Sequence, residues 1–481
     1  MDKSIGDFNI SRDADHFIIA ELVGQVVTVK DILIELFLPH NNEEEVVLIC
    51  KPNSQQYNDL KKEYEFSING YDEFSDGSIN NNFFVKRAFR KKSHPTFYTS
   101  KLRDFTIVLQ AYDLMIVCER DNPQGNGETK GYFTIFNRFQ VPPLKSLLRK
   151  PNGEVTVDPR EKYSFVLESG VKLTFDIFYR YENTEDYTKS YPYAVAEFKT
   201  DLDPERINEI IVEIDDFLLL VSLALETICV CTGWIAFSNS KKVTYYRRDR
   251  VIPDKEESSS YSEYLIEPFE LITFLEKSYK AFIGFNDREL LRNILFPLVR
   301  RKKISIETHY LILFAILESI ILNYKKNNNY EFILRKDDFN NLKNDLKEFI
   351  KLKLSSIDKI KRKFIYEKLS ELNRVSFPSS LELYQKHYNI KIDDLWPLFD
   401  SKTGASLADI RNKIIHGETF SNHQFQAISF AMHHLQIIVE RMVLSLLSWN
   451  ISKSRVSSEY TKQHFAKDFE KVKYYQKLFE K

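Results

Sequence analysis

The sequence predicts an α+β fold, in which a mostly-β region of sandwich or barrel type precedes an all-helical region. Two observations predict it. In residues 1–200, short runs of β-branched and aromatic residues alternate with turn clusters such as Asn69–Gly70. From about residue 263 onward, apolar residues recur at helical spacing. The chain has 481 residues, which is enough for roughly two to four domains with sizeable cores.

The mostly-β region, residues 1–200, is expected to hold a sensor or regulator. Many short strands separated by turns are typical of a sandwich or barrel. Pro151–Gly153 could divide the region into two subdomains near residue 151. The predicted strands are Gln25–Val29, Val46–Cys50, Phe83–Val85, Thr106–Leu109, Leu114–Val117, Tyr132–Phe136, Tyr163–Leu167 and Val171–Tyr179.

Residues 201–300 are predicted to be a helical and mixed connector. A single helix is expected over 204–231, with Asp203 as N-cap and Pro204 in the first turn. The run Phe217–Phe237 is apolar enough to suggest a membrane span. Glu226 near its centre and Gly233 favour instead a buried helix that runs into a strand. A polar stretch at 253–260 marks a domain boundary.

Residues 301–450 are predicted to form a helical bundle, followed by a basic, exposed helix over 451–481. Ile306–Tyr324 is apolar on nearly every face, so we expect it to be buried on all sides. The other expected helices are Phe339–Leu354, Ile357–Arg374, Asp409–His416 and Phe425–Trp449.

Charge is unevenly distributed along the chain. Its formal net charge is −1, but residues 301–450 contain 23 Lys and Arg against 17 Asp and Glu. A basic region beside an acidic remainder is typical of a polyanion-binding module, although a solvated helix surface has the same composition. Four cysteines without a CxxC pair, and a polar N-terminus, suggest reduced thiols and a cytoplasmic protein. The sequence lacks the P-loop, GxSxG and HExxH motifs, which argues against an NTPase, a serine hydrolase and a zincin.

The most informative segment is 409–418, which reads DIRNKIIHGE. On a helix, Asn412 and His416 share a face, while Arg411 lies about 140° around the axis from His416. Gly417 is expected to end the helix. His416 would then lie in the last turn, where the helix dipole favours the imidazolium form.

An arginine and a histidine in this arrangement suit RNA cleavage. RNA carries its own nucleophile, the 2′-hydroxyl. A histidine can move a proton, and an arginine can neutralise charge on the phosphoryl oxygens, so no metal or other cofactor is required. The same two residues would also be explained by a salt bridge of Arg411 and a helix cap at His416.

The full pattern resembles the motif of the HEPN superfamily, and the wider region resembles its ApeA-like branch. The motif is Arg411-Asn412-x-x-x-His416, followed by Gly417. An apolar helix with an embedded Glu318 precedes it, and a long apolar helix follows it. The resemblance covers roughly residues 300–450.

The resemblance implies a bundle of helices that forms a homodimer and brings two copies of the motif into one cleft. It implies an endoribonuclease that acts in bacterial antiphage defence by abortive infection, or as a toxin. Arg411 and His416 would be catalytic, and Asn412 would orient them or hold the phosphate. Family toxins that are silenced by nucleotide transfer have a Tyr two residues after the His. Here that residue is Glu418, so this modification is not predicted.

Other residues are expected to support the site. Glu318, in an apolar helix, needs a cationic partner, and Arg411 or His416 is the expected one. Candidate RNA contacts are Arg300, Arg301, Lys302, Lys303, Lys361, Arg362, Lys363 and Lys413, together with the clusters 245–248 and 87–92. His433 and His434 are adjacent, so a surface or interface role is favoured over a metal site.

The predicted partners are RNA, either tRNA or another cellular RNA, a second copy of the chain, and a phage-derived trigger, without a membrane. Two alternatives stay open. One is a non-catalytic HEPN module for dimerisation and for binding RNA or a nucleotide. The other is a β-sandwich binding protein in which the motif is accidental.

Overall fold

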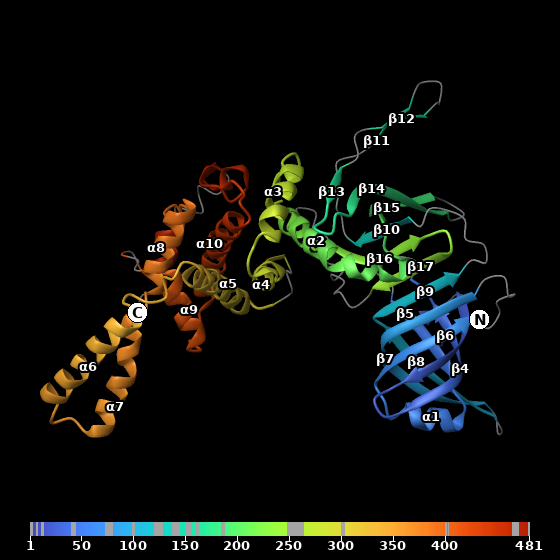
Figure 1. The fold of residues 1–481 in the computed structure, drawn as a ribbon, viewed down its shortest axis with the longest axis horizontal. Helices are drawn as coiled ribbons and strands as arrows, with labels where there is room; N and C mark the ends of the chain where they lie inside the picture. Colours follow the sequence, from blue (N-terminus) through green and yellow to red (C-terminus); the bar gives the residue numbers. More distant parts are fainter. Residues whose placement is uncertain are drawn as a thin grey trace. The chain divides into compact units, whose positions relative to one another are not determined.

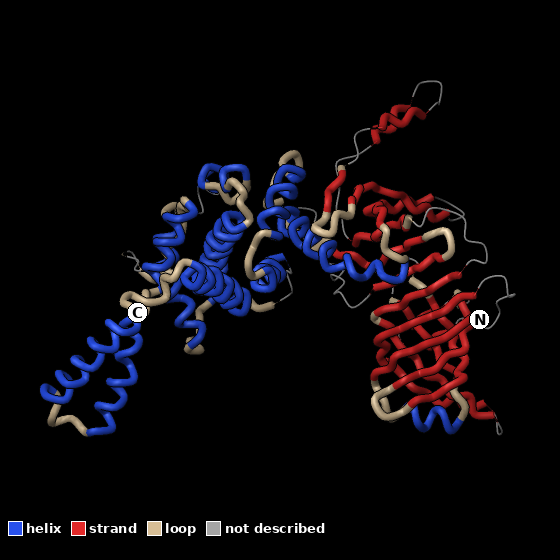
Figure 2. Tube along the Cα trace, in the orientation of Figure 1, coloured by secondary structure: helices blue, strands red, loops and turns tan. Residues whose placement is uncertain are grey.

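The structure is a computed structural model. It describes residues 3–5, 8–10, 14–39, 45–72, 80–98, 102–119, 128–136, 145–149, 155–159, 163–183, 188–247, 264–299, 304–399, 402, 404–463 and 471–479. The chain divides into two compact units, Met1–Glu263 and Tyr264–Lys481. The first is mostly β and the second is helical, so the predicted α+β class is confirmed at this level (Figure 2).

The first unit contains a barrel and a sheet that share strands. The elements up to the barrel's last strand are β1 (Lys3–Ile5), β2 (Phe8–Ile10), β3 (His16–Val23), β4 (Thr28–Phe37), β5 (Val46–Lys51), α1 (Ser54–Leu60), β6 (Glu65–Asp72), β7 (Asn80–Tyr98) and β8 (Leu102–Ala111). Six strands pair in the order β7-β6-β3-β4-β5-β8, and β8 pairs again with β7, which closes the barrel. Alternate apolar side chains of these strands, such as Ile18, Ala20 and Leu22, fill the interior.

The sheet continues outward from the barrel through the first part of β7. Its other strands are β9 (Asp113–Glu119), β10 (Thr129–Phe136), β13 (Ser164–Val166), β14 (Lys172–Asn183), β15 (Thr188–Thr200), β16 (Val230–Phe237) and β17 (Lys241–Arg247). A separate hairpin is formed by β11 (Lys145–Arg149) and β12 (Val155–Pro159). One hydrogen-bonded sheet therefore runs through residues on both sides of the predicted division near 151, and that division is not seen.

A helix packs on the sheet. The 3-10 helix η1 (Pro204–Ile210) begins at the predicted N-cap Asp203, and α2 (Ile211–Leu225) follows it. Glu226, with φ 49°, ends α2, and the chain then enters β16. The apolar stretch is thus a buried helix and a strand, as expected, but the single helix predicted over 204–231 is wrong. Phe217 of α2 packs against Phe165 and Phe175 of the sheet, with ring centroids 4.8 and 5.5 Å apart.

The predicted strands match the structure unevenly. Seven of the predicted strands overlap β5, β7, β8, β9, β10, β13 and β14, but β3, β4, β6 and β15 were not predicted as strands. The predicted strand Gln25–Val29 is wrong, because Gly24–Val27 forms the turn of the β3–β4 hairpin, where Gly24 N donates to Val27 O. The predicted connector 201–300 is not one body either, since its residues are divided between the two units.

The second unit is helical. Its elements are α3 (Leu271–Ile283), α4 (Arg288–Val299), α5 (Ile306–Asn327), α6 (Lys336–Lys353), α7 (Lys359–Lys368), η3 (Leu369–Asn373), α8 (Phe377–Tyr388), α9 (Leu407–Ile415), α10 (Asn422–Leu446), η4 (Ile451–Lys453) and α12 (Val472–Lys477). Helix α5 packs against α10, α8, α4 and α9. The hairpin of α6 and α7 extends away from these helices (Figure 1).

Helix α5 is buried on one side only, contrary to the prediction. Leu313, Leu317 and Ile321 are buried, whereas Ala315 and Leu322 are exposed. Among the described residues α5 is the one helix long and apolar enough to cross a membrane. In this structure it carries Glu318 on its solvent-facing side, and it packs against other helices of the unit.

A buried ion pair holds the end of α10. Arg441 contacts Asp394 at 2.7 Å and also donates to the carbonyls of Val456 and Lys391. Burial acts to raise the pKa of Asp394, but the hydrogen bonds from Arg441 outweigh it and leave the pKa below its usual range. This cluster fixes two segments to α10: the one that precedes α9 and the one that follows α10 itself.

The C-terminal tail is not the single exposed helix that the sequence predicts. It contains η4, a helical turn over 458–463 and α12, and residues 464–470 lie outside the described part. Gln476 and Phe479 are buried. Gln424 on α10 donates to Leu478 O, so the last described residues pack against the bundle.

Candidate functional site

The candidate site lies at the C-terminal end of α9. Ser406 and Asp409 form a reciprocal capping box at its start. Leu407 and Ile410 are fully buried, and Tyr310 of α5 donates to Leu407 O at 2.8 Å. These contacts fix one side of α9 to the bundle, and residues 411–413 and 415–418 lie away from that side.

The helix ends in a Schellman motif, as the sequence predicts. Gly417 has φ 69°, its N–H donates to Ile414 O, and Glu418 N donates to Lys413 O. A Cβ added at Gly417 would meet nothing within 4 Å, so only the backbone conformation demands glycine. The motif places His416, the cap residue, and Glu418 on the exposed surface.

Arg411 is held by α5. Its Nη2 lies 3.1 Å from Glu318 Oε1, its Nη1 donates to Asn412 Oδ1, and its guanidinium lies 5.6 Å from the centre of the Phe314 ring. The predicted pairing of Glu318 with Arg411 is confirmed. The prediction that Glu318 is buried is wrong, because its side chain is 45% exposed. Such an exposed pair contributes little stability, so its main effect is on the direction of the guanidinium.

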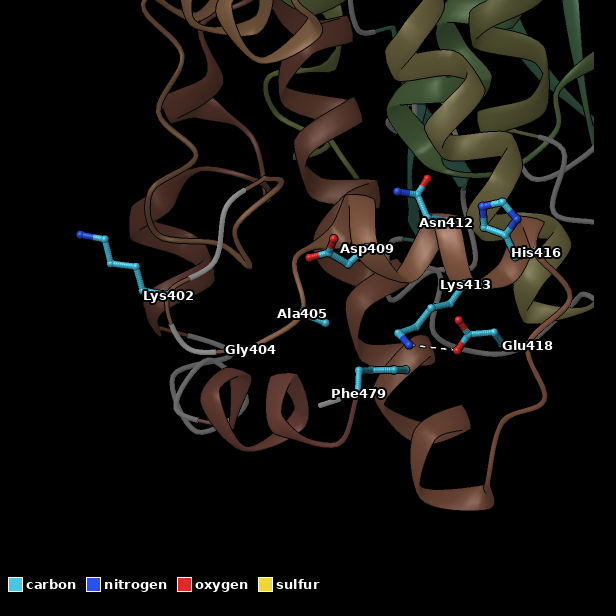
Figure 3. Close-up of a pocket in the computed structure, with 9 residues that line it drawn as sticks. All are labelled: Lys402, Gly404, Ala405, Asp409, Asn412, Lys413, His416, Glu418 and Phe479. Carbon is cyan, nitrogen blue, oxygen red and sulfur yellow. Dashed lines mark hydrogen bonds and ion pairs between the residues drawn. The ribbon is translucent and has the colours of Figure 1, made fainter. Parts of the chain in front are cut away.

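His416 and Asn412 are among the residues that line an open pocket of about 560 Å³, which we call the His416 pocket (Figure 3). Their side chains point to the same side of α9, as helical spacing predicts. Arg411 is not among the lining residues. The other residues of the pocket are Lys402, Gly404, Ala405, Asp409, Lys413, Glu418 and Phe479.

Lys413 is the predicted RNA contact that the structure places in this pocket. Its side chain is 19% exposed and lies 2.9 Å from Glu418 (Figure 3). No sequence pattern singled out Lys402, Asp409 or Phe479 as site residues. Phe479 reaches the wall because α12 packs on the loop before α9, where Ala405 N donates to Gln476 O.

A second depression of about 440 Å³, lined by residues 417–420 among others, is called the Phe420 pocket. Its lining residues are Glu307, Ile414, Gly417, Glu418, Thr419, Phe420 and Phe425. The two pockets share Glu418. Sequence reasoning missed this pocket, since Glu307 begins α5 and lies more than one hundred residues before the motif.

The other predicted RNA contacts that the structure describes do not line these pockets. Lys361, Arg362 and Lys363 lie on α7 in the extended hairpin. Arg300, Arg301, Lys302 and Lys303 lie outside the described residues, as does Arg248. Arg247 makes two hydrogen bonds to Asp215 and is nearly buried, and Arg87 pairs with Glu65 and lies over Phe89.

Of the two histidines on α10, only His433 lies on the surface, as predicted for the pair. His433 is exposed, but His434 is buried, and its Nδ1 accepts a hydrogen bond from Trp396 N at 3.1 Å. Burial lowers the pKa of His434 to about 3, so its neutral form is held in the core. Within the described ranges, no group of three or more His, Cys, Asp or Glu is placed to hold a metal ion. All four cysteines are free thiols.

The arrangement offers a proton-transfer group, a cation and a fixed arginine within one short segment. His416 and Asn412 open to solvent beside Lys413, and Arg411 is oriented on the adjoining face by Glu318. Such groups can bind a phosphodiester and move a proton on it. No protein-family model matches the chain, and no curated protein and no solved structure matches it either.

Proposed function

We propose that the chain is a metal-independent endoribonuclease of the HEPN type, with Arg411, Asn412 and His416 as its active residues. The observation that carries the proposal is the arrangement at the end of α9. All three side chains lie at least partly in solvent, and Arg411 is oriented by Glu318 and Phe314. The bundle core does not bury these polar groups, so they are open to a ligand.

The chemistry uses the 2′-hydroxyl of RNA. His416 takes the proton of this hydroxyl while its oxygen attacks the adjacent phosphorus. The bond to the 5′-oxygen breaks, and this oxygen takes a proton from a protonated His416 imidazole or from water. The products are a 2′,3′-cyclic phosphate and a 5′-hydroxyl end. Arg411 and Lys413 stabilise the negative charge on the phosphoryl oxygens, and Asn412 holds the phosphate or orients Arg411.

The working site is proposed to be shared by two copies of the chain. Arg411 points to α5 and does not line the His416 pocket, so the residues of one copy do not face a common point. The solvent-facing side of α5 beside Glu318 exposes Ala315 and Leu322, and Ile415 of α9 is 50% exposed. A second copy that covers these side chains would bring its own α9 close, which gives one cleft with two motifs.

A role in antiphage defence or as a toxin, in the cytoplasm, belongs to the same proposal. The first unit would act as a sensor of a phage-derived trigger, and the helical unit would cut tRNA or another cellular RNA. One observation favours a non-catalytic RNA-binding or dimerisation module instead. Arg411 is already paired with Glu318 and Asn412, as a structural arginine would be.

The test is cleavage of total RNA by purified protein in excess EDTA, with end-group analysis of the products. We expect 2′,3′-cyclic phosphate ends with the wild type and loss of cleavage with His416→Ala and with Arg411→Ala. His423→Ala, which removes another exposed histidine, is the matched control and should cleave normally. A wild type that cuts no RNA, with or without infected-cell extract, would favour the non-catalytic module. Cleavage that requires added Mg²⁺ would overturn the mechanism.

A further inference from the structure

The two pockets at the end of α9 differ in chemistry. The His416 pocket contains two lysines, Lys402 and Lys413, and two carboxylates, Asp409 and Glu418, beside the motif residues. The Phe420 pocket is lined by two aromatic rings and two carboxylates, and none of its lining residues is a lysine or arginine. Cations suit phosphate, whereas aromatic faces and acceptors suit a base. The His416 pocket thus suits the phosphate of a nucleotide, and the Phe420 pocket suits its base.

The aromatic rings of the Phe420 pocket are fixed. Phe425 lies in the first turn of α10, behind the capping box of Ser421 and Gln424. Phe420 packs edge-on against Phe425, with centroids 6.0 Å apart and an interplanar angle of 74°. Phe420 also contacts Phe479 edge-on at 6.4 Å. Both Phe420 and Phe425 are partly exposed, so an exposed ring surface is available for stacking.

The acceptor of the pocket is Glu307, in the first turn of α5. The other carboxylate, Glu418, is paired with Lys413. An ionised carboxylate only accepts hydrogen bonds. Guanine presents two adjacent donors, N1–H and the N2 amino group, which match both carboxylate oxygens. Adenine and cytosine offer one amino group, and uracil has a single N–H between two carbonyl oxygens that repel a carboxylate.

We infer that the Phe420 pocket binds the guanine base of a nucleotide that flanks the scissile phosphate, so that cleavage occurs next to guanosine. Phe420 stacks on the base and Glu307 accepts from its Watson–Crick edge. The volume of about 440 Å³ is within the usual range for small-molecule pockets. The inference rests on the proposed function, which supplies the phosphate position at His416.

Binding is measured first, because it does not depend on cleavage. The full chain is titrated calorimetrically with 3′-GMP and 5′-GMP and with the corresponding AMP and UMP isomers. At least one of the two GMP isomers should bind more tightly than the AMP and UMP isomers with the phosphate in the same position. Glu307→Gln should lower the affinity for that GMP roughly tenfold and leave UMP unchanged. Phe420→Leu should weaken the binding of every base. Glu382→Gln is the control: it removes an exposed carboxylate on α8, away from both pockets' lining residues, and should bind these nucleotides as the wild type does.

Cleavage sites are then mapped on a mixed-sequence RNA. We expect cuts next to guanosine, and we expect Glu307→Gln to cut without that preference. His416→Ala should still bind GMP although it cuts nothing. If the wild type cuts RNA but neither cutting nor binding prefers guanine, the inference is wrong and the nuclease proposal stands. If GMP binds through Glu307 but no RNA is cut, the base pocket stands and the nuclease proposal fails. If neither occurs, both are wrong.

Discussion

Glu318 Oε1 lies 3.1 Å from Arg411 Nη2, so the central helix of the bundle sets the direction of the arginine on α9. Because both side chains are partly exposed, we expect Glu318→Gln to change the free energy of unfolding by less than about 1 kcal/mol. Cleavage should fall roughly tenfold, mainly in kcat, because a freely rotating guanidinium spends less time at the phosphoryl group. Glu371→Gln breaks another exposed pair, with Lys368, and should leave cleavage unchanged. An equal loss in both variants would contradict a positioning role.

Gly417 allows a second prediction with a matched control. Its φ of 69° is strained for any residue with a Cβ, so Gly417→Ala should cost about 1 kcal/mol and displace His416 and Glu418. Gly170 in the first unit has φ 84° and equally open surroundings. Gly170→Ala should therefore cost a similar amount in thermal denaturation while RNA cleavage stays normal. Normal cleavage by Gly417→Ala would show that the helix end does not set the site.

The shared cleft predicts complementation between inactive chains. Neither Arg411→Ala nor His416→Ala should cleave alone. When the two variants are mixed, briefly unfolded and refolded together, they form mixed dimers. Each mixed dimer keeps one intact arginine and one intact histidine, on different copies of the chain. We expect these mixtures to regain a measurable fraction of wild-type cleavage. Light scattering of each variant should give the mass of a dimer. A monomer mass, or mixtures that stay inactive, would contradict a composite site.

His434 should make the stability of the helical unit depend on pH. Its pKa is about 3 in the folded protein and near 6.5 when unfolded, so below pH 6.5 the unfolded chain takes up a proton that the folded chain does not. The contribution of His434 is complete above pH 6.5 and is lost as the pH falls toward 3, at up to about 1.4 kcal/mol per pH unit. Denaturant titrations from pH 7.5 to 4.5 measure it. His434→Asn keeps an acceptor for Trp396 N and should lower this slope, and an unchanged slope would rule out His434 as its source.

The parts of the site that could be predicted are those fixed by local rules. Helical spacing placed Asn412 and His416 on one face, and Gly417 ended the helix, because both depend only on neighbouring residues. Glu318 was correctly paired with Arg411, but its burial was overestimated. An apolar sequence does not reveal which side of α5 is covered. Phe479 and Glu307 reach the site through tertiary packing, and no local sequence pattern predicts such contacts.

The fold also has features that local sequence rules predict and features that depend on tertiary packing. The change from strands to helices could be predicted, since it follows from periodicity. The closure of the barrel could not, because it depends on the pairing of β8 with β7 after five intervening pairings in space. His434 was misassigned for a related reason, since only the position of Trp396 makes a buried imidazole acceptable.

Strand β7 belongs to both parts of the first unit. Residues 80–84 pair with β9 of the open sheet, and residues 88–98 pair with β8 of the barrel. One backbone and one ladder of hydrogen bonds thus join a closed shell to an open layer. Rotation of one part against the other would break that ladder, and unfolding of either part would leave β7 without its neighbours on that side. A force or a ligand that acts on β7 in the barrel wall is therefore passed along the same backbone to β9 and the open sheet.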